Sequence, residues 1–317
     1  MAAIDLGTNN CRLLIAAPGR EGSIRIIDSF SRIVKLGEGV ARSGILSEAA
    51  IDRTVAALKV CAAHIERHSV HHVRAVATEA CRAASNANVL VERVAKETGL
   101  TLTVISAAEE ARLASTGCAP LIGAHYEGAL VFDIGGGSTE VIWLHREKGQ
   151  TEIVHFDSVP LGVMTLAESA GVQPADFSYP AMLADMRNRF SLVKRDMDLK
   201  GGFFDHTRYH LLGTSGTVTT LAGIALKLPR YVRSRVDASW HECETMQTVV
   251  KEIIALDRQG RASLGCVGTE RADLIVPGCA IFSAIHEVWP CGRLRVADRG
   301  LREGILRELM AEARHEQ

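Results

Sequence analysis

The sequence predicts an α/β protein built from two similar halves. Residues 4–15 and 132–142 share one pattern, in which an Asp follows an apolar run, a Gly comes two positions later, and small polar residues lead into an apolar strand. Each copy is followed by a turn, a further strand pattern and then a Leu-Gly pair, at 36–37 or 161–162. A repeat of this kind indicates a duplicated fold.

Length and charge limit the possible functions of such a fold. At about 150 residues per domain, 317 residues suggest two domains, each large enough to bury its own core. A net charge of −1 excludes a generally basic nucleic-acid binder, and an aromatic content of 5% leaves few rings on which bases could stack. We therefore expect no nucleic-acid partner.

Cysteine usage and hydropathy indicate the compartment. Eight cysteines are scattered without a C-x-x-C pair, which argues against a zinc site and against a disulfide framework. Neither a basic-then-apolar leader nor a run of about 18 apolar residues occurs in the sequence. We expect a reduced, cytoplasmic protein without a membrane partner.

Helical and strand periodicities alternate through the first half. Ser47 is expected to cap a helix over 48–65, whose apolar residues recur with helical spacing. A strand over 73–78, a helix over 89–96 capped by Asn86, and a strand over 100–105 follow in turn.

Four histidines gather at the end of the first helix: His64, His68, His71 and His72. They superficially resemble a metal cluster. Because no carboxylate or cysteine completes the set, we expect a solvated helix end instead.

Two charged residues of the first half are candidates for a functional site. Arg82 follows the strand 73–78, where it could meet an anion at the edge of a sheet. Glu109 and Glu110 open a helix after Ser106, a position where acidic residues ordinarily serve the helix dipole. That helix leads through a short linker to the second repeat, so the Glu110 carboxylate could reach over a phosphate bound there.

The second repeat carries the clearest chemistry. Three glycines at 135–137 and then Ser138 follow an apolar strand, and the N–H groups of such a loop can hold a phosphate. Asp133 ends that strand and Glu140 begins the returning strand, so both carboxylates could face one cation. Oxygen ligands beside a phosphate suit Mg²⁺ better than zinc. A plain glycine-rich hairpin would show the same loop pattern.

A second loop of small residues leads into a helix at 213–217 and is also typical of phosphate binding. It lacks a Lys after its glycines, and because G-x-x-x-x-G-K-[ST] occurs nowhere, a P-loop is excluded. Downstream, four cations could form a track for a polyanion, although a solvated loop is the favoured interpretation: Lys227, Arg230, Arg233 and Arg235.

The linker 118–128, with one proline and two glycines, is the expected domain junction. We therefore expect an N-terminal domain over 1–124 and a C-terminal domain over 125–317, with a closing helix over 300–314 able to pack back on the first domain. Within the second domain, 175–196 is expected to be helical and 294–296 to be a short strand.

Six motifs in a fixed order over almost the whole chain resemble the exopolyphosphatase and guanosine pentaphosphate phosphohydrolase (Ppx/GppA) family. They are Asp5-Leu6-Gly7-Thr8-Asn9; Ala77-Thr78 with Arg82; Glu109-Glu110-Ala111; Asp133-Ile134-Gly135-Gly136-Gly137-Ser138-Thr139-Glu140; Gly213-Thr214-Ser215-Gly216-Thr217; and Leu301-Arg302-Glu303-Gly304. Ala107 and Asn10 depart from the family's usual Gly and Ser, and both substitutions are small.

The resemblance implies the fold shared by sugar kinases, the 70-kDa chaperones and actin. That fold has two ribonuclease-H-like domains with a catalytic cleft between them. Longer members of the family carry an additional helical region similar to HD phosphohydrolases. This chain ends at Gln317 and has no His-Asp dipeptide, so it resembles the short form. A homodimer is also implied.

The resemblance further implies roles for the candidate residues. Glu110 matches the family's catalytic glutamate, which orients and deprotonates the attacking water. Asp133 and Glu140 would hold Mg²⁺ or another hard divalent cation, directly or through water. Arg82 and the opposite loop, Thr8 with Asn9, would help to hold the terminal phosphate.

In this interpretation the amides of 135–138 cradle that phosphate and 213–217 binds phosphates further along the substrate. The expected reaction releases orthophosphate from one end of inorganic polyphosphate. Hydrolysis of guanosine pentaphosphate to the tetraphosphate would use the same residues and stays open. A kinase reaction of the same fold and a non-catalytic sensor of these guanosine phosphates stay open as well.

Overall fold

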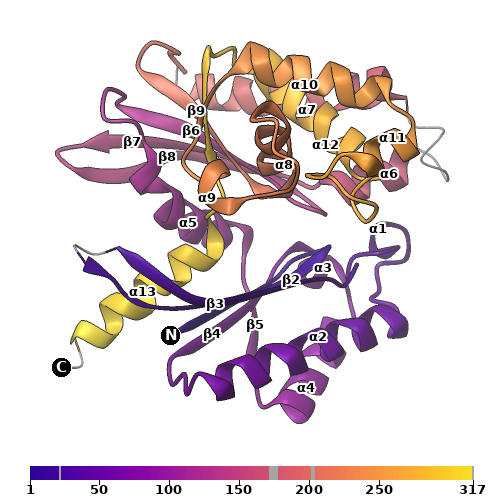
Figure 1. Cartoon of the computed structure of the whole chain (residues 1–317), viewed down its shortest axis with the longest axis vertical. Helices are drawn as coiled ribbons and strands as arrows, with labels where there is room; N and C mark the ends of the chain where they lie inside the picture. The colour runs from indigo at the N-terminus through magenta and orange to yellow at the C-terminus, as the bar shows by residue number, and fades with distance from the viewer. Residues whose placement is uncertain (21–22, 171–177, 201–203, 316–317) are drawn as a thin grey trace. The chain divides into compact units, whose positions relative to one another are not determined.

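A computed structural model of the chain describes residues 1–20, 23–170, 178–200 and 204–315. The chain forms two compact units, Met1–Gly117 with Gly300–Gln317, and Cys118–Arg299. Each unit is built on a single sheet with helices against it (Figure 1).

The first unit contains a five-stranded sheet in the order β3-β2-β1-β4-β5. β1 is antiparallel to β2 and parallel to β4, and β4 is parallel to β5. The strands are β1 (Ala2–Leu6), β2 (Asn10–Pro18), β3 (Ile24–Ile33), β4 (Val73–Ala77) and β5 (Leu102–Val104). The helices of this unit are α1 (Val40–Ser43), α2 (Glu48–Arg67), α3 (Glu79–Ala83), α4 (Ala87–Thr98), α5 (Ala107–Cys118) and α13 (Leu301–His315).

The central strands β1 and β2 are buried on both faces, and their side chains alternate between the two faces. Ile4 and Leu13 lie opposite each other and pack with α2 and α4. Ala3 and Leu14, one residue along, point to the other face and pack with α5 and α13. The closing helix is therefore part of the core of the first unit.

The predicted cap at Ser47 is confirmed, and the predicted cap at Asn86 is wrong. Ser47 precedes α2 and its Oγ accepts a hydrogen bond from the amide of Ala50 at 3.3 Å. Asn86 does precede α4, but its side chain makes no capping bond. It pairs instead with the backbone of Leu46, accepting at 2.8 Å and donating at 3.0 Å, and so ties two loops together.

The expectation that no carboxylate accompanies the histidines of α2 is wrong. Asp28 reaches them from β3, with its Oδ2 atom 2.7 Å from Nδ1 of His64 and 3.0 Å from Nε2 of His68. The sequence could not show this, because Asp28 is 36 residues from His64 and the pairing depends on how α2 lies against the sheet.

The second unit contains a six-stranded sheet in the order β10-β11-β9-β6-β7-β8. The strands are β6 (Gly128–Ile134), β7 (Thr139–Glu147), β8 (Gln150–Val159), β9 (Tyr209–Thr214), β10 (Trp240–Glu242) and β11 (Arg293–Ala297). The helices are a 3-10 turn (Ala119–Leu121), α6 (Val163–Ala170), α7 (Tyr179–Leu199), α8 (Ser215–Ala225), α9 (Arg233–Val236), α10 (Cys243–Ala255), α11 (Arg258–Ser263) and α12 (Ile275–Val288). The predicted helix 175–196 corresponds to α7, and residues 175–177 lie outside the described part.

The predicted duplication is confirmed by the two sheets. In each, three consecutive antiparallel strands are followed by two parallel strands, β1-β4-β5 or β6-β9-β11. The second strand of each repeat has a β-bulge starting at Ile15 or Trp143, and both residues stand ten positions after the repeat's Asp. Such irregularities seldom recur by chance. The matching β-bulges therefore support a duplicated fold.

Among the described residues, no helix is both long enough and apolar enough to cross a lipid bilayer.

Candidate active site

Two carboxylates of the second repeat face each other across a hairpin. Asp133 on β6 and Glu140 on β7 are directly opposed in the antiparallel register, so their side chains point to the same face of the sheet. Glu140 is 3% exposed and Asp133 is partly exposed. The predicted pairing of these two acids is therefore a feature of the second unit.

Two serines hold the Glu140 carboxylate in place. Ser138 and Ser158 donate hydrogen bonds to Oε1 of Glu140 at 2.6 and 2.8 Å. These two hydrogen bonds fix the direction of the Glu140 carboxylate. Carboxylate and hydroxyl oxygens are the ligands that Mg²⁺ prefers, so the residues fit a magnesium site.

Ser158 was not predicted from the sequence as part of the site. It lies opposite Glu140 in the β7–β8 register, and that register follows only once the β-bulge at Trp143 is known.

The glycine loop after β6 presents its amides to an incoming ligand. The carbonyls of Gly135 and Gly136 already accept hydrogen bonds. Their donors are the amides of Val163 and Met164 at the start of α6, at 2.9 and 2.8 Å. Within the described part of the chain, the amides of 136–138 have no hydrogen-bond acceptor. Successive N–H groups left in this way form an anion-binding nest.

The Leu-Gly pair of each repeat presses against its loop. A Cβ on Gly162 would lie 2.4 Å from Gly135 O and 2.5 Å from Gly136 C. In the first unit, a Cβ on Gly37 would lie 2.2 Å from Cγ2 of Thr8. The atoms close to Gly162 belong to the backbone, so only glycine permits this approach and the pair at 161–162 shapes the loop 135–138.

The second predicted loop lies beside Asp133. Thr214, the last residue of β9, is paired with Asp133 in the parallel register, so the loop 213–217 and the two carboxylates share one edge of the sheet. Ser215, the first residue of α8, has φ +95° and a buried Oγ without a hydrogen-bond partner among the described residues. Strain and an unpaired buried polar atom together are typical of a functional site.

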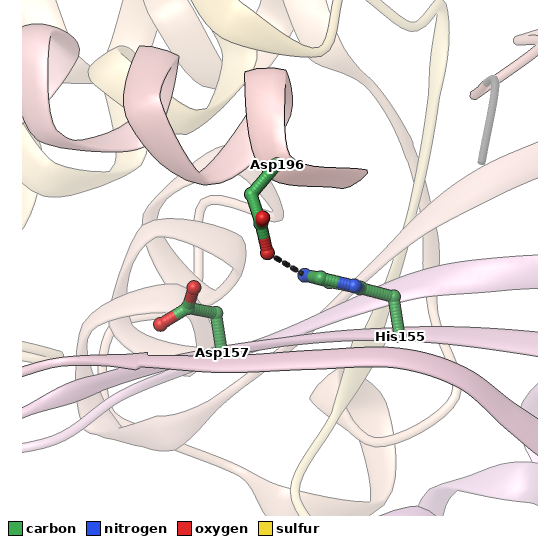
Figure 2. Close-up of side chains that lie close together, drawn as sticks. All are labelled: His155, Asp157 and Asp196. Carbon is green, nitrogen blue, oxygen red and sulfur yellow. Dashed lines mark ion pairs between the residues drawn. The ribbon is translucent and has the colours of Figure 1, made fainter. Parts of the chain in front are cut away.

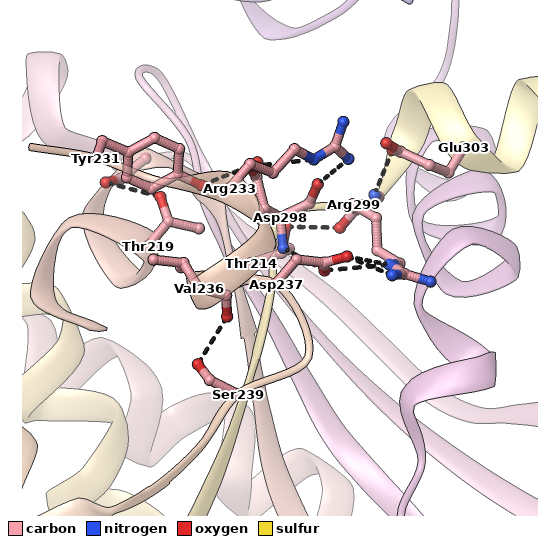
Figure 3. A network of polar contacts seen from close by, with 12 residues as sticks. Thr214, Thr219, Tyr231, Arg233, Val236, Asp237, Ser239, Asp298, Arg299 and Glu303 are labelled. Carbon is pink, nitrogen blue, oxygen red and sulfur yellow. Dashed lines mark hydrogen bonds and ion pairs between the residues drawn. The ribbon is translucent and has the colours of Figure 1, made fainter. Parts of the chain in front are cut away.

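Thr214 of this second loop takes part in a network of polar contacts (Figure 3). Thr214 Oγ1 donates to Arg299 O at 3.0 Å, and the Arg299 guanidinium binds Asp237, with Nε 3.1 Å from both carboxylate oxygens. Tyr231 and Arg233 both bind Asp298. Arg233 is therefore not the solvated cation expected from the sequence, whereas Lys227, Arg230 and Arg235 are exposed.

In the first unit, Arg82 and Glu110 form an ion pair. Nη1 of Arg82 lies 2.8 Å from Glu110 Oε2, while its Nη2 binds Glu79 at 2.8 Å. Both partners are largely buried, with 18% and 16% of the two side chains exposed. Burial works against the charge on Arg82, but the Glu110 and Glu79 carboxylates outweigh it and raise the pKa of Arg82.

The first loop repeats the geometry of the second repeat. Amides of residues 34, 35 and 37 donate to the carbonyls of Thr8 and Asn9 at 2.9–3.0 Å, and the amide of Gly7 closes the turn onto Asn10 O at 2.9 Å. Asn9 Oδ1 is buried and has no hydrogen-bond partner in the described residues. A ligand group could satisfy it.

The acidic pair itself is not duplicated. Asp5 is the counterpart of Asp133, but the residue opposite Asp5 is Arg12 rather than an acid. Burial raises the pKa of Asp5, and Arg12 and Arg302 oppose that shift. Within the repeats, therefore, only the second unit carries the opposed carboxylates that suit a hard cation.

The structure thus groups the predicted residues in two sets. The second unit brings Asp133 and Glu140 together with the loops 135–138 and 213–217. The first unit brings Arg82 to Glu110 and holds Thr8 and Asn9 in the matching loop.

Comparison with known proteins gives one family. The model of the Ppx/GppA phosphatase family matches residues 15–313. A protein named exopolyphosphatase 2 from Mycobacterium tuberculosis is 31% identical, over 96% of this chain and 97% of its own.

Solved structures agree with this match. The crystal structure of the Aquifex aeolicus member of the Ppx/GppA family has a TM-score of 0.78 at 30% identity and covers 100% of this chain and 98% of its own. An exopolyphosphatase from Cytophaga hutchinsonii has a TM-score of 0.84 at 25% identity, over 98% of this chain and 97% of its own. The α/β fold of the actin-like type expected from the sequence is thereby confirmed.

Proposed function

The chain belongs to the Ppx/GppA phosphatase family, and from that premise we propose that it is an exopolyphosphatase, which releases the terminal phosphate of inorganic polyphosphate as orthophosphate. The names of the Mycobacterium and Cytophaga relatives support this substrate.

One observation carries the proposal. The opposed carboxylates of Asp133 and Glu140, the open amides of 136–138 and the first turn of α8 share one edge of a sheet. Carboxylates would repel an anion unless a cation lies between them, whereas amides and a helix N-terminus attract one. The combination suits a chain of phosphates held jointly by protein N–H groups and a metal ion.

In the proposed reaction, Glu110 orients the attacking water and accepts its proton. The ion pair with Arg82 fixes the direction of the Glu110 carboxylate. A weak base is sufficient, because phosphoryl transfer to water depends mainly on positioning and on charge stabilisation. The 135–138 amides, with Thr8 and Asn9, hold the terminal phosphate, and 213–217 holds the phosphates behind it.

Asp133 and Glu140 would hold Mg²⁺, and the bound ion would supply neutralisation of the terminal phosphate oxygens. The serine contacts to Glu140 keep one of these ligands oriented when substrate leaves.

Glu110→Gln tests the role of the base. We expect kcat to fall about 10²- to 10⁴-fold, since a positioned general base contributes that much, while polyphosphate binding persists. Its neighbour Glu109 is the matched control, because it is more exposed and pairs with Arg112 on its own helix. Glu109→Gln should keep nearly full kcat. Near-normal turnover by Glu110→Gln would show that Glu110 is not the general base.

The substrate is tested by measuring orthophosphate release with Mg²⁺ from short polyphosphate, long polyphosphate and guanosine pentaphosphate in parallel. We expect polyphosphate to give the higher kcat/KM. Faster release from guanosine pentaphosphate would make the chain a guanosine pentaphosphate phosphohydrolase. Transfer of phosphate to ADP or a sugar, instead of to water, would contradict hydrolysis altogether.

A further inference from the structure

A second group of possible metal ligands lies in the second unit, apart from the carboxylates of the proposed active site. His155 and Asp157 stand two residues apart on β8, so their side chains point to the same face. Asp196 comes from the last turns of α7, which packs against that face. Figure 2 shows the His155 ring directed at Asp196, with Asp157 on the same strand.

The distances suit a shared ion. One nitrogen of His155 and one oxygen from each aspartate all lie within 4.8 Å of one another. Atoms that bind one zinc ion at about 2.0–2.2 Å lie about 3–4 Å apart. Small side-chain rotations would therefore close the site without moving the backbone.

The state of His155 points to a missing ligand. Its side chain is 7% exposed, yet Nε2 is buried without a hydrogen-bond partner among the described residues. Oδ2 of Asp196 lies 4.0 Å away, which is beyond hydrogen-bonding distance. A buried polar atom without a hydrogen-bond partner destabilises the folded state unless a ligand binds it.

A lysine lies beside this group of side chains. Lys200 binds the same Oδ2 of Asp196 at 2.7 Å, but that ion pair is exposed, at 64% and 46% of the two side chains. Exposed pairs are weak, so an ion could displace the lysine.

We propose that His155, Asp157 and Asp196 form a binding site for a divalent first-row transition-metal ion such as Zn²⁺, which ties α7 to the edge strand β8. An imidazole ligand selects such ions over Mg²⁺. The site is therefore distinct in chemistry from the pair Asp133 and Glu140. Asp196 is half exposed, which gives the ion a path of entry.

Titration calorimetry of the chelator-treated full chain with Zn²⁺ tests this site. We expect a binding event whose affinity falls at least about tenfold in His155→Ala and Asp196→Asn, since changes around a metal site cost that much even outside the ligand set. Asp185→Asn, on the same helix but paired with Arg189, is the control and should leave it unchanged. Asp133→Asn should also retain this event, which separates it from binding at the proposed active site.

Histidine-ring NMR keeps the test independent of folding defects in the variants. In the unsubstituted chain, Zn²⁺ should shift the ring-nitrogen signals of His155, and an equal concentration of Mg²⁺ should not. An unchanged His155 signal, or equal Zn²⁺ isotherms for the chain and His155→Ala, would overturn the proposal.

Discussion

At the scale of single residues, the carboxylate of Glu140 depends on a partner that is distant in sequence. Ser158 supplies one of its two serine hydrogen bonds. We expect Ser158→Ala to raise the Mg²⁺ concentration for half-maximal phosphate release about 10- to 100-fold, because residues that orient a ligand commonly have that effect. Ser191→Ala, on the exposed side of α7, is the control. An unchanged Mg²⁺ requirement in Ser158→Ala would show that Ser158 does not orient a metal ligand.

His210 should make the stability of the second unit sensitive to acid. Its ring is fully buried, with the Gly123 amide donating to Nε2 and Nδ1 2.8 Å from Leu211 O, so the neutral ring fits both contacts. Burial lowers the pKa of His210 from 6.5 to about 4. The unfolded chain then binds the proton more readily, so stability present above pH 6.5 is lost as the pH falls towards 4.

The measurement for His210 is urea unfolding at pH 7 and pH 5. The histidine should contribute about 2 kcal/mol to the decrease in unfolding free energy between these values. His210→Gln cannot titrate and should show a correspondingly smaller decrease. Equal decreases in both proteins would mean that the ring is not held neutral.

At the scale of elements, the contact between the loop 135–138 and the start of α6 positions the proposed phosphate site. Gly162→Ala would place a methyl group 2.4 Å from Gly135 O, so the loop must shift. We expect kcat/KM to fall about 10²-fold, the usual result of a displacement near 1 Å in a positioned site. Gly292→Ala is the control, because no atom lies within 4 Å of its added Cβ. Full activity in Gly162→Ala would show that the loop does not hold the reacting phosphate.

Elements and motifs of this chain were largely predictable, and the reason is local. The glycine loop, the cap at Ser47 and the opposed Asp133 and Glu140 depend on residues a few positions apart, which sequence spacing reports. The partners Asp28 and Ser158 were missed because they depend on helix placement and strand register. The strained Ser215 and the orphaned Nε2 of His155 also leave no signal in residue types.

At the scale of the whole molecule, the first unit depends on the end of the chain. Ile305 and Leu306 of α13 are fully buried against Ala3 and Leu14 of its sheet. A chain ending at residue 299 would expose that face, and each large apolar side chain lost costs about 1.5–3 kcal/mol, against a total stability of about 5–15 kcal/mol. We expect proteolysis to degrade residues 1–117 of this shortened chain while 118–299 resists. Protection of both segments would contradict the role given to α13.

The division of the first unit between the two ends of the sequence affects its folding during translation. The last strand of the first sheet ends at Val104 and α13 begins at Leu301, so the ribosome adds roughly two hundred residues between them. Residues 118–299 form one continuous segment and can collapse as soon as they leave the exit tunnel. During translation the part of the N-terminal sheet that α13 covers therefore stays exposed until late, and we expect nascent chains to bind chaperones that recognise apolar surface.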